Sequence, residues 1–478
     1  MFKTQQRRLL LASITIRKLM VRDKITRISQ SYEMDQPLTK EQTLKSRDKY
    51  IGKSCTLFFR ENPLKIVRAR GQYMYDENDV EYLDCINNVC HVGHCHPDVV
   101  KAGSEQMSIL NTNSRYLNDN IVLLAEKLLS TFPAPLSRVF FANSGSEAND
   151  LALQLAKVHT EAQDTIVLDQ AYHGITYAAM AISPYKSISN RPDWVHITSN
   201  PDIYRGKYNT LKYKENELGL LYAKDVENLV NDLNSSNRKV ACFVHESLQS
   251  CAGQLTMPEN YLKNAYKIIR DNGGVCLADE VQVGFGRVGK CWWAFELSDV
   301  VPDIVTIGKP FGNGHPISAV VTTDEIANSY LKRGPSFFST YGGNPVSCKV
   351  ALTVIETIEK ENLRENALRV GDILIRKAKE LQKKHKYIGD VRGIGFYIGI
   401  ELVSDLEQRK PATREAEWIK NFLKEKHIII SHDGPDENVL KFKPPMCFSE
   451  KDADRLISQL DAALTELVKI NENTPSTI

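Results

Sequence analysis

The sequence lacks a strong charge bias, long apolar runs and any composition typical of a non-globular chain. Its 61 lysines and arginines nearly balance 59 aspartates and glutamates, which leaves a formal net charge of +2. This balance gives no support for nucleic-acid binding, which favours a basic excess. No apolar run approaches the roughly 18 residues of a membrane span. Apolar residues make up 42% of the 478 positions, which excludes a disordered, collagen-like or coiled-coil chain.

The cysteines also lack the pattern of a disulfide framework. The ten of them are scattered along the chain, and several lie inside apolar stretches, such as Cys242 and Cys276. Small secreted domains that are stabilised by disulfides contain many cysteines within a short chain. The pattern therefore predicts reduced thiols.

Residues 1–22 differ from the rest of the chain. They contain six lysines and arginines and no acidic residue, interleaved with leucine, isoleucine and valine. Such a segment is typical of a mitochondrial presequence. The alternatives are a disordered basic extension or a true start at Met34, with a cytoplasmic enzyme. Without these six charges the rest of the chain carries −4 rather than +2.

The hydrophobic pattern predicts an α/β fold. A polar helix is expected over 36–56 and strand-like segments over 66–69, 72–75 and 81–86. Further on, helices (98–110, 120–131, 146–160, 223–234, 258–272, 345–361) alternate with apolar strands (138–142, 165–169, 240–244, 275–278, 303–307, 318–322). Continuous apolar strands are typical of parallel strands buried on both faces.

This alternation predicts a large three-layer α/β/α domain with a mostly parallel sheet. The tail, with strands over 388–392, 396–402 and 428–431, predicts a smaller α+β domain. The expected organisation is a presequence or extension (1–34), an N-terminal segment joining the small domain (35–98), the large domain (99–345) and the C-terminal small domain (346–470).

Three segments carry candidate chemistry. Gly145 and Ser146 open a helix directly after a strand, where backbone N–H groups can bind a phosphate; an ordinary N-cap is the alternative. Asp279 ends an apolar strand, where ligands of α/β sheets bind, although a capping acid would look the same. Lys309 also follows a buried strand, where a lysine can act as an amine nucleophile; a solvated lysine is its alternative.

Together these segments predict pyridoxal 5'-phosphate as cofactor. Lys309 would form the Schiff base, Asp279 would pair with the pyridine nitrogen, and the helix N-terminus would hold the phosphate.

The same segments, with others in order along the chain, carry a resemblance to a known family. The sequence resembles the class III aminotransferases among the fold-type I pyridoxal-phosphate enzymes, from about residue 50 to 466. Within them it is most similar to the alanine–glyoxylate aminotransferase 2-like subgroup, which includes ethanolamine-phosphate and 5-phosphohydroxy-lysine phospho-lyases. The matching segments are CINNVCHVGHCHP (85–97), LNTNSRYL (110–117), NSGSEANDLAL (143–153), ADEVQVGFGRVGK (278–290), GKPFGNGHP (308–316), STYGGNPVSC (339–348) and LKFKPPMCF (440–448).

The resemblance implies a role for each matched residue. Lys309 would also move the proton, and Asp279 would sustain the pyridinium. The remaining cofactor contacts would come from Tyr172 and Val281 on the two ring faces, Gly145 and Ser146 at the phosphate, and Gln282 and Glu246 near the phenolic oxygen. Thr340 would reach the phosphate of a neighbouring subunit, which implies a homodimer, or a dimer of dimers, with shared active sites. Arg392 would hold a substrate carboxylate.

One departure from the family favours a lyase. Dual-substrate members carry a glutamate where this chain has Cys251, and that glutamate pairs with the carboxylate-binding arginine between half-reactions. Without it, Arg392 is expected to be uncompensated. The resemblance at Gln249 and Pro310 favours the ethanolamine enzyme. The expected function is a phospho-lyase that acts on a small phosphorylated amine, O-phosphoethanolamine.

Several alternatives stay open. They are 5-phosphohydroxy-lysine as substrate, alanine–glyoxylate transamination, and a catalytically silent relative, which the intact Lys309 and Asp279 argue against. The Gly-x-Gly-x-x-Gly at 284–289 is not expected to open a helix, so it does not predict a dinucleotide site. The cysteines and histidines at 90–96 are spaced too closely for a zinc site. One of these histidines, or Arg115, could instead bind the substrate phosphate.

Overall fold

The computed structural model describes residues 38–185 and 190–473, so the predicted presequence and extension lie outside the described residues. The chain divides into two compact units at Lys65. The described part of the first contains α2 (Lys40–Tyr50). This helix begins with a capping box, in which Thr39 and Gln42 bind each other's backbone N–H. It is shorter than the predicted helix and ends before Gly52.

The core of the second unit is a seven-stranded sheet in the order β4-β10-β9-β8-β7-β5-β6. Its strands are β4 (Leu136–Ala142), β5 (Asp164–Leu168), β6 (Val195–Thr198), β7 (Val240–Glu246), β8 (Val275–Asp279), β9 (Ile304–Ile307) and β10 (Ser318–Thr323). Strands β5 to β9 run parallel, whereas β10 is antiparallel to both β4 and β9. The prediction of a parallel strand was therefore wrong for β10, because burial on both faces does not fix direction.

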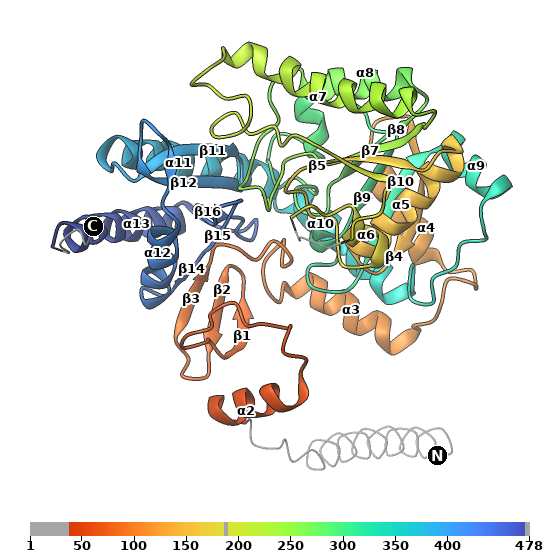
Figure 1. Cartoon of the computed structure of the whole chain (residues 1–478). Helices are drawn as coiled ribbons and strands as arrows, with labels where there is room; N and C mark the ends of the chain where they lie inside the picture. The colour runs from red at the N-terminus through yellow and green to blue at the C-terminus, as the bar shows by residue number, and fades with distance from the viewer. Residues whose placement is uncertain (1–37, 186–189, 474–478) are drawn as a thin grey trace, which may run out of the picture. The chain divides into compact units, whose positions relative to one another are not determined.

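Helices cover both faces of this sheet (Figure 1). Val244 of β7 packs in one cluster with Leu151 and other residues of α5 (Gly145–Thr160). Phe243, the preceding residue, packs in the opposite cluster with α7 (Glu215–Ser235) and α8 (Tyr261–Asp271). Alternate side chains of one strand thus serve two cores, as in a three-layer α/β/α arrangement.

The sequence reading missed several short or polar elements. These are α6 (Tyr177–Ala181), β6 and α9 (Asp324–Arg333). The other elements around the large sheet are α3 (Pro97–Ile109), α4 (Asp119–Leu129), η1 (Ala294–Ser298), η2 (Lys309–Gly312) and α10 (Pro345–Lys360).

The C-terminal part forms an antiparallel sheet, β11-β12-β16-β15, with β13 paired to β12. Its elements are α11 (Leu363–Lys384), β11 (Ile388–Ile394), β12 (Tyr397–Asp405), β13 (Lys410–Pro411), α12 (Thr413–Glu425), β14 (Ile428–Ile429), β15 (Ser431–Asp433), β16 (Val439–Phe442) and α13 (Glu450–Asn473). The predicted strand over 428–431 is divided between β14 and β15.

The first three strands of the second unit form a small sheet with a strand of its C-terminal part, in the order β1-β2-β3-β14. Its first three strands are β1 (Ile66–Arg70), β2 (Tyr73–Asp76) and β3 (Glu81–Asp84). Strand β3 pairs in parallel with β14, so Leu83 lies beside Ile428. The predicted domain boundaries themselves stay a prediction.

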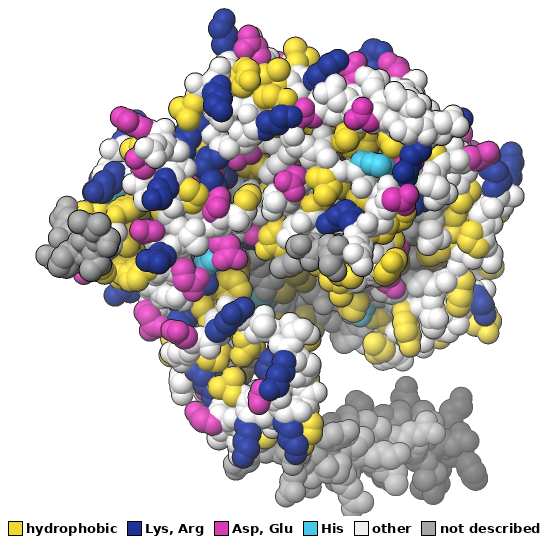
Figure 2. Space-filling model, in the orientation of Figure 1, with side chains coloured by type: hydrophobic (Ala, Val, Ile, Leu, Met, Phe, Trp, Pro, Cys, Tyr) yellow, Lys and Arg dark blue, Asp and Glu magenta, His cyan; other side chains and the backbone are white. Residues whose placement is uncertain are grey.

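Two surface properties complete the description. None of the helices within 38–185 and 190–473 combines the length and apolar character of a membrane span. On the face shown in Figure 2, lysine and arginine side chains are interspersed with aspartates and glutamates.

Candidate active site

The carboxyl ends of β7, β8 and β9 bring the predicted catalytic residues together. Glu246 ends β7 and Asp279 ends β8, and the two are paired in register. Asp279 is in turn paired with Thr306 of β9, three residues before Lys309. Ligands of parallel sheets bind at this edge.

Asp279 is buried and surrounded by hydrogen-bond donors. Its Oδ2 accepts from His173 Nδ1 at 2.7 Å and from Asn149 Nδ2 at 2.8 Å, and its Oδ1 accepts from the Val281 N–H at 3.0 Å. Burial alone would raise the pKa of Asp279, but His173, Asn149 and this N–H outweigh burial and lower the pKa. Asp279 is therefore ionised at neutral pH and can pair with a cationic ring nitrogen.

Lys309 begins η2 directly after β9. Its backbone has a φ of +24°, a region disfavoured for a side-chain-bearing residue and often found at functional sites. Burial lowers the pKa of its amine, and the charges of Asp279 and Glu246 offset this only in part. A lowered pKa favours the neutral amine, which is the form that acts as a nucleophile or base.

The N-terminus of α5 forms a narrow cradle. A Cβ on Gly145 would lie 2.9 Å from a methyl group of Val281, and one on Gly308 would lie 3.4 Å from the Gly145 nitrogen. Ser144 caps the helix by accepting from the Glu147 N–H at 3.2 Å. The N–H groups of Gly145 and Ser146 donate to no residue that the structure describes. Such free N–H groups at a helix N-terminus suit a phosphate.

Glu246 contacts a further predicted residue, Tyr172. It accepts from the Tyr172 N–H at 3.2 Å and from the Ser250 N–H at 3.0 Å. Burial raises the pKa of Glu246, and the charge of Asp279 adds to this effect. Gln282 follows Val281 and accepts from Asn88 Nδ2 at 2.7 Å.

The sequence reading missed the residues that position Asp279. Asn149 holds Asp279 while its own Oδ1 accepts from Thr306 Oγ1 at 2.8 Å. His173 is equally close to Asp279, and its Nε2 has no partner among the described residues. Asn149 lies inside the matching segment 143–153 and His173 directly follows the predicted Tyr172, so both positions were near predicted residues although their roles were not predicted.

Comparison with known proteins identifies the family. Residues 59–464 match the family model described as aminotransferase class-III. The chain belongs to the class-III aminotransferases. An alanine–glyoxylate aminotransferase 2-like protein of Drosophila melanogaster is 50% identical and covers 90% of this chain and 88% of its own. Ethanolamine-phosphate phospho-lyase homolog 1 of Caenorhabditis elegans is 44% identical, over 89% of this chain and 94% of its own.

A solved structure of similar fold is an Arthrobacter phospholyase in complex with phosphoethanolamine. It has a TM-score of 0.85 and 35% identity, and the match covers 88% of this chain and 99% of that one. These findings confirm the predicted family, the fold-type I class and a pyridoxal-phosphate-dependent enzyme.

The residues of this class-III aminotransferase fit that cofactor. The site offers an ionised acid for the ring nitrogen (Asp279) and a buried amine for the aldehyde (Lys309). It also offers the free N–H groups of Gly145 and Ser146 for the phosphate. Val281 lies against the same cradle. The roles of the individual residues stay a prediction.

The expectation for Arg392 was wrong in one respect. Arg392 is not uncompensated: its Nη1 lies 2.7 Å from Asp390 and 2.8 Å from Glu401. Its Nε and Nη2 donate to the Gly253 carbonyl at 3.0 and 2.7 Å. Burial would lower the pKa of Arg392, but the charges of Glu401, Asp390 and Asp202 raise it. The absent glutamate at position 251 is replaced by acids from β11 and β12.

Other predicted candidates lie in different surroundings. Thr340 is exposed, but its neighbour Ser339 accepts from Asn143 Nδ2 at 3.1 Å, just before the α5 cradle. Arg115 stacks its guanidinium over Phe338 at 3.8 Å. The Gly-x-Gly-x-x-Gly segment forms turns with positive φ at Gly286 and Gly289, and no helix opens there, as expected.

Each of the three histidines of segment 90–96 has a partner that is not one of the predicted site residues. His91 donates to the Phe285 carbonyl at 2.7 Å, His94 binds Asp84 at 2.7 Å, and His96 binds Glu361 at 2.9 Å. The three histidines are therefore engaged elsewhere.

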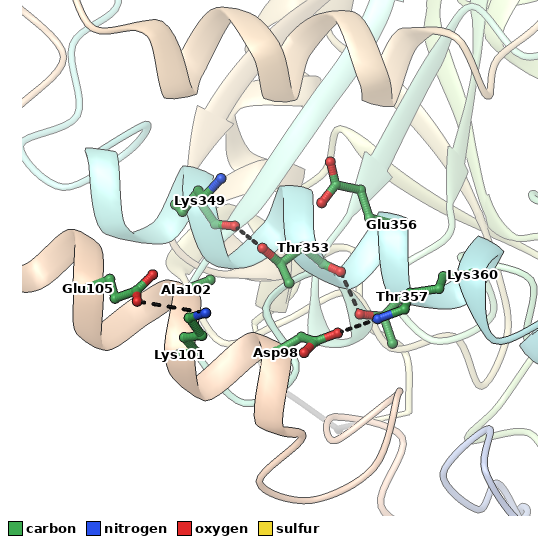
Figure 3. A pocket seen from close by; sticks show the side chains of 9 residues that line it. All are labelled: Asp98, Lys101, Ala102, Glu105, Lys349, Thr353, Glu356, Thr357 and Lys360. Atoms are coloured by element: carbon green, nitrogen blue, oxygen red, sulfur yellow. Dashed lines mark hydrogen bonds and ion pairs between the residues drawn. The ribbon is translucent and has the colours of Figure 1, made fainter.

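A separate pocket of about 280 Å³ lies between α3 and α10 and contains none of the predicted site residues (Figure 3). Ion pairs cross or flank it, with Lys360 at 2.9 Å from Asp98 and Lys101 at 4.0 Å from Glu105. Paired, exposed charges of this kind do not indicate a ligand site.

Proposed function

We propose that this enzyme is a phospho-lyase that converts O-phosphoethanolamine and water to acetaldehyde, phosphate and ammonia. The observation that carries the proposal is the pairing of Arg392 with two carboxylates of β11 and β12, where dual-substrate relatives are expected to pair it with a single glutamate. Amino-acid substrates need a free cation for their carboxylate, whereas phosphoethanolamine has no carboxylate. The similarity to a phospholyase crystallised with phosphoethanolamine supports the same substrate.

The residues at the strand ends support the chemistry. Bound pyridoxal phosphate supplies an electron-accepting ring at the carbon that carries the substrate amine. Asp279, kept ionised by His173 and Asn149, holds the ring nitrogen protonated. The Lys309 amine takes the proton from the amine-bearing carbon. The electron pair left on that carbon forms a double bond to the second carbon, whose bond to the ester oxygen breaks, so that phosphate leaves with the bonding pair. Water then hydrolyses the released enamine to acetaldehyde and ammonia.

The experiment incubates the holoenzyme separately with O-phosphoethanolamine, 5-phosphohydroxy-lysine, and alanine with glyoxylate. We expect equal amounts of phosphate and acetaldehyde from the first substrate. Phosphate released only from 5-phosphohydroxy-lysine would favour the second lyase. Turnover of alanine and glyoxylate alone would overturn the lyase proposal.

We also propose a homodimer in the mitochondrion. The basic segment 1–22 supports the location. The exposure of Thr340, next to a loop anchored at the α5 cradle, is consistent with a contact to a second subunit. Sedimentation of the holoenzyme and fractionation of cells test the two parts.

A further inference from the structure

A second buried amine lies near the strand ends and is not used by the reaction steps above. Lys443 directly follows β16, and its side chain is 3% exposed. Its Nζ donates to Ser250 Oγ at 2.7 Å and to Gln282 Oε1 at 2.7 Å. Both acceptors are uncharged. A buried ammonium group with only neutral acceptors is costly, because burial removes its water without supplying an opposite charge.

Another buried cation shares this environment. Arg287 is fully buried, and it donates to the Pro444 carbonyl and to His91 Nδ1. Neither Lys443 nor Arg287 forms an ion pair with any residue in the described ranges. Lys441, two residues before Lys443, pairs with Asp433. Burial, followed by the positive charges of Lys441, Lys309 and Arg287, lowers the pKa of Lys443 well below its ordinary value. The lowered pKa favours the uncharged amine of Lys443 in the free enzyme, and a bound anion would favour its charged form.

Hydrogen bonds connect Lys443 to the catalytic strand ends. Gln282 lies three residues after Asp279, at the end of β8. Ser250 donates its N–H to Glu246, which is paired in register with Asp279. Lys309, Gln282 and Lys441 are each partly exposed, although most of their neighbours are buried. The charges of Lys309 and Lys441 both act on Lys443, so the three amines lie near one another.

We propose that Lys443 binds the phosphate group of the substrate. This inference rests on the proposed function and names the residue that selects a phosphate ester. A phosphate dianion would supply the negative charge that this region lacks, and it bonds strongly to buried ammonium groups. When the carbon–oxygen bond breaks, negative charge grows on the leaving phosphate, so the same amine stabilises its departure.

The test compares the holoenzyme with its Lys443→Met and Lys443→Arg variants. KM and kcat are measured by phosphate release from O-phosphoethanolamine, and the binding of inorganic phosphate and 2-aminoethylphosphonate by calorimetry. For Lys443→Met we expect KM to rise and both affinities to fall by about 10- to 100-fold, as for a lost charged hydrogen bond. Lys443→Arg should recover part of this loss. Lys424→Met removes a buried lysine of α12 and serves as the matched control, with unchanged KM.

A merely structural role would give a different result. If Lys443 only holds Gln282 in place, Lys443→Met would change the cofactor absorption spectrum and leave the two anion affinities at wild-type values. That outcome would overturn the inference. If Lys443→Met fails to bind cofactor, Lys443→Gln, which keeps a hydrogen-bond donor without the charge, replaces it in every measurement.

The inference and the proposed function can fail separately. If wild type releases phosphate from O-phosphoethanolamine and Lys443→Met keeps its KM and anion affinities, the inference is overturned and the lyase stands. If wild type releases no phosphate, the lyase proposal fails and calorimetry alone decides. Weaker binding of 2-aminoethylphosphonate by Lys443→Met would then support an anion site, and equal binding would overturn it.

Discussion

Arg392 and Lys443 are two buried cations on either side of β12 in one sheet, and their surroundings are opposite. Arg392 on β11 lies within 2.8 Å of two carboxylates and also binds a carbonyl. Lys443, directly after β16, bonds to a hydroxyl and an amide oxygen. Arg392 thus has carboxylate partners within the protein, whereas Lys443 has only uncharged ones. The comparison shows that the partners of a cation, rather than its residue type, decide whether it can receive an anionic substrate.

The largest effect is expected at Lys309, because the roles proposed for Arg392 and for Lys443 both presuppose catalysis by its amine. Lys309→Ala should lower phosphate release by at least about 10⁴-fold, because it removes both the nucleophile and the proton acceptor. Mass spectrometry after borohydride reduction should find cofactor attached to wild type and none attached to the variant. Lys424→Ala is the control. Residual activity above about one per cent of wild type would contradict the assignment.

Substitution of Arg392 should lower stability and leave substrate binding nearly unchanged. Arg392→Met should lower the free energy of unfolding by about 3 kcal/mol, because Glu401 and Asp390 lose their buried counterion. KM for O-phosphoethanolamine should change less than threefold. Urea denaturation of the holoenzyme measures the first quantity, and phosphate release the second. The double variant Arg392→Met/Glu401→Gln should recover part of the stability. A rise in KM as large as that expected for Lys443→Met would contradict the different roles of the two cations.

Substitution of Asp279 tests the role of the buried carboxylate in the site. Asp279→Asn keeps the size of the side chain and removes its charge, so kcat should fall by about 10²- to 10³-fold, as for other lost electrostatic contacts. Because Asp279 and Lys443 share no hydrogen bond among the described residues, the affinity for 2-aminoethylphosphonate should fall much less than in Lys443→Met. Stopped-flow and calorimetric measurements on the same preparation give both values. Equal losses in both variants would argue against separate roles.

Glu280 is an acidic counterpart of Lys443, and here the expected effect is the smallest. It is fully buried and accepts from the N–H groups of Ala294 and Phe295. Burial raises its pKa to about 7. The folded state then binds a proton that the unfolded state has already lost, so stability falls as pH rises from about 4.5 to about 7 and is level above.

The measurement compares wild type with Glu280→Gln. Between about pH 5.5 and 6.5, wild type should lose about 1.4 kcal/mol of unfolding free energy relative to the variant. Urea titrations at several pH values give this difference. Parallel pH curves for the two proteins would contradict the raised pKa.

The sequence predicted the elements that carry the site because their patterns are local. Apolar runs marked β7, β8 and β9 to within a few residues, and a small polar segment marked the start of α5. The direction of a strand could not be predicted from its pattern. Strand β10 has the same apolar pattern as the parallel strands of the sheet but runs antiparallel to β9. The helices α6 and α9 were missed because one is short and the other largely polar.

The sequence by itself determined the cofactor chemistry of this protein, since Lys309, Asp279 and the Gly145 segment each lie at a strand end or helix start that local patterns reveal. Only the tertiary structure decided which buried charges are balanced. Glu401 reaches Arg392 because β11 and β12 pair in register. Gln282 and Lys443 meet across 161 residues of chain. The energy of a buried charge depends on groups within a few ångströms, and folding alone brings those groups together.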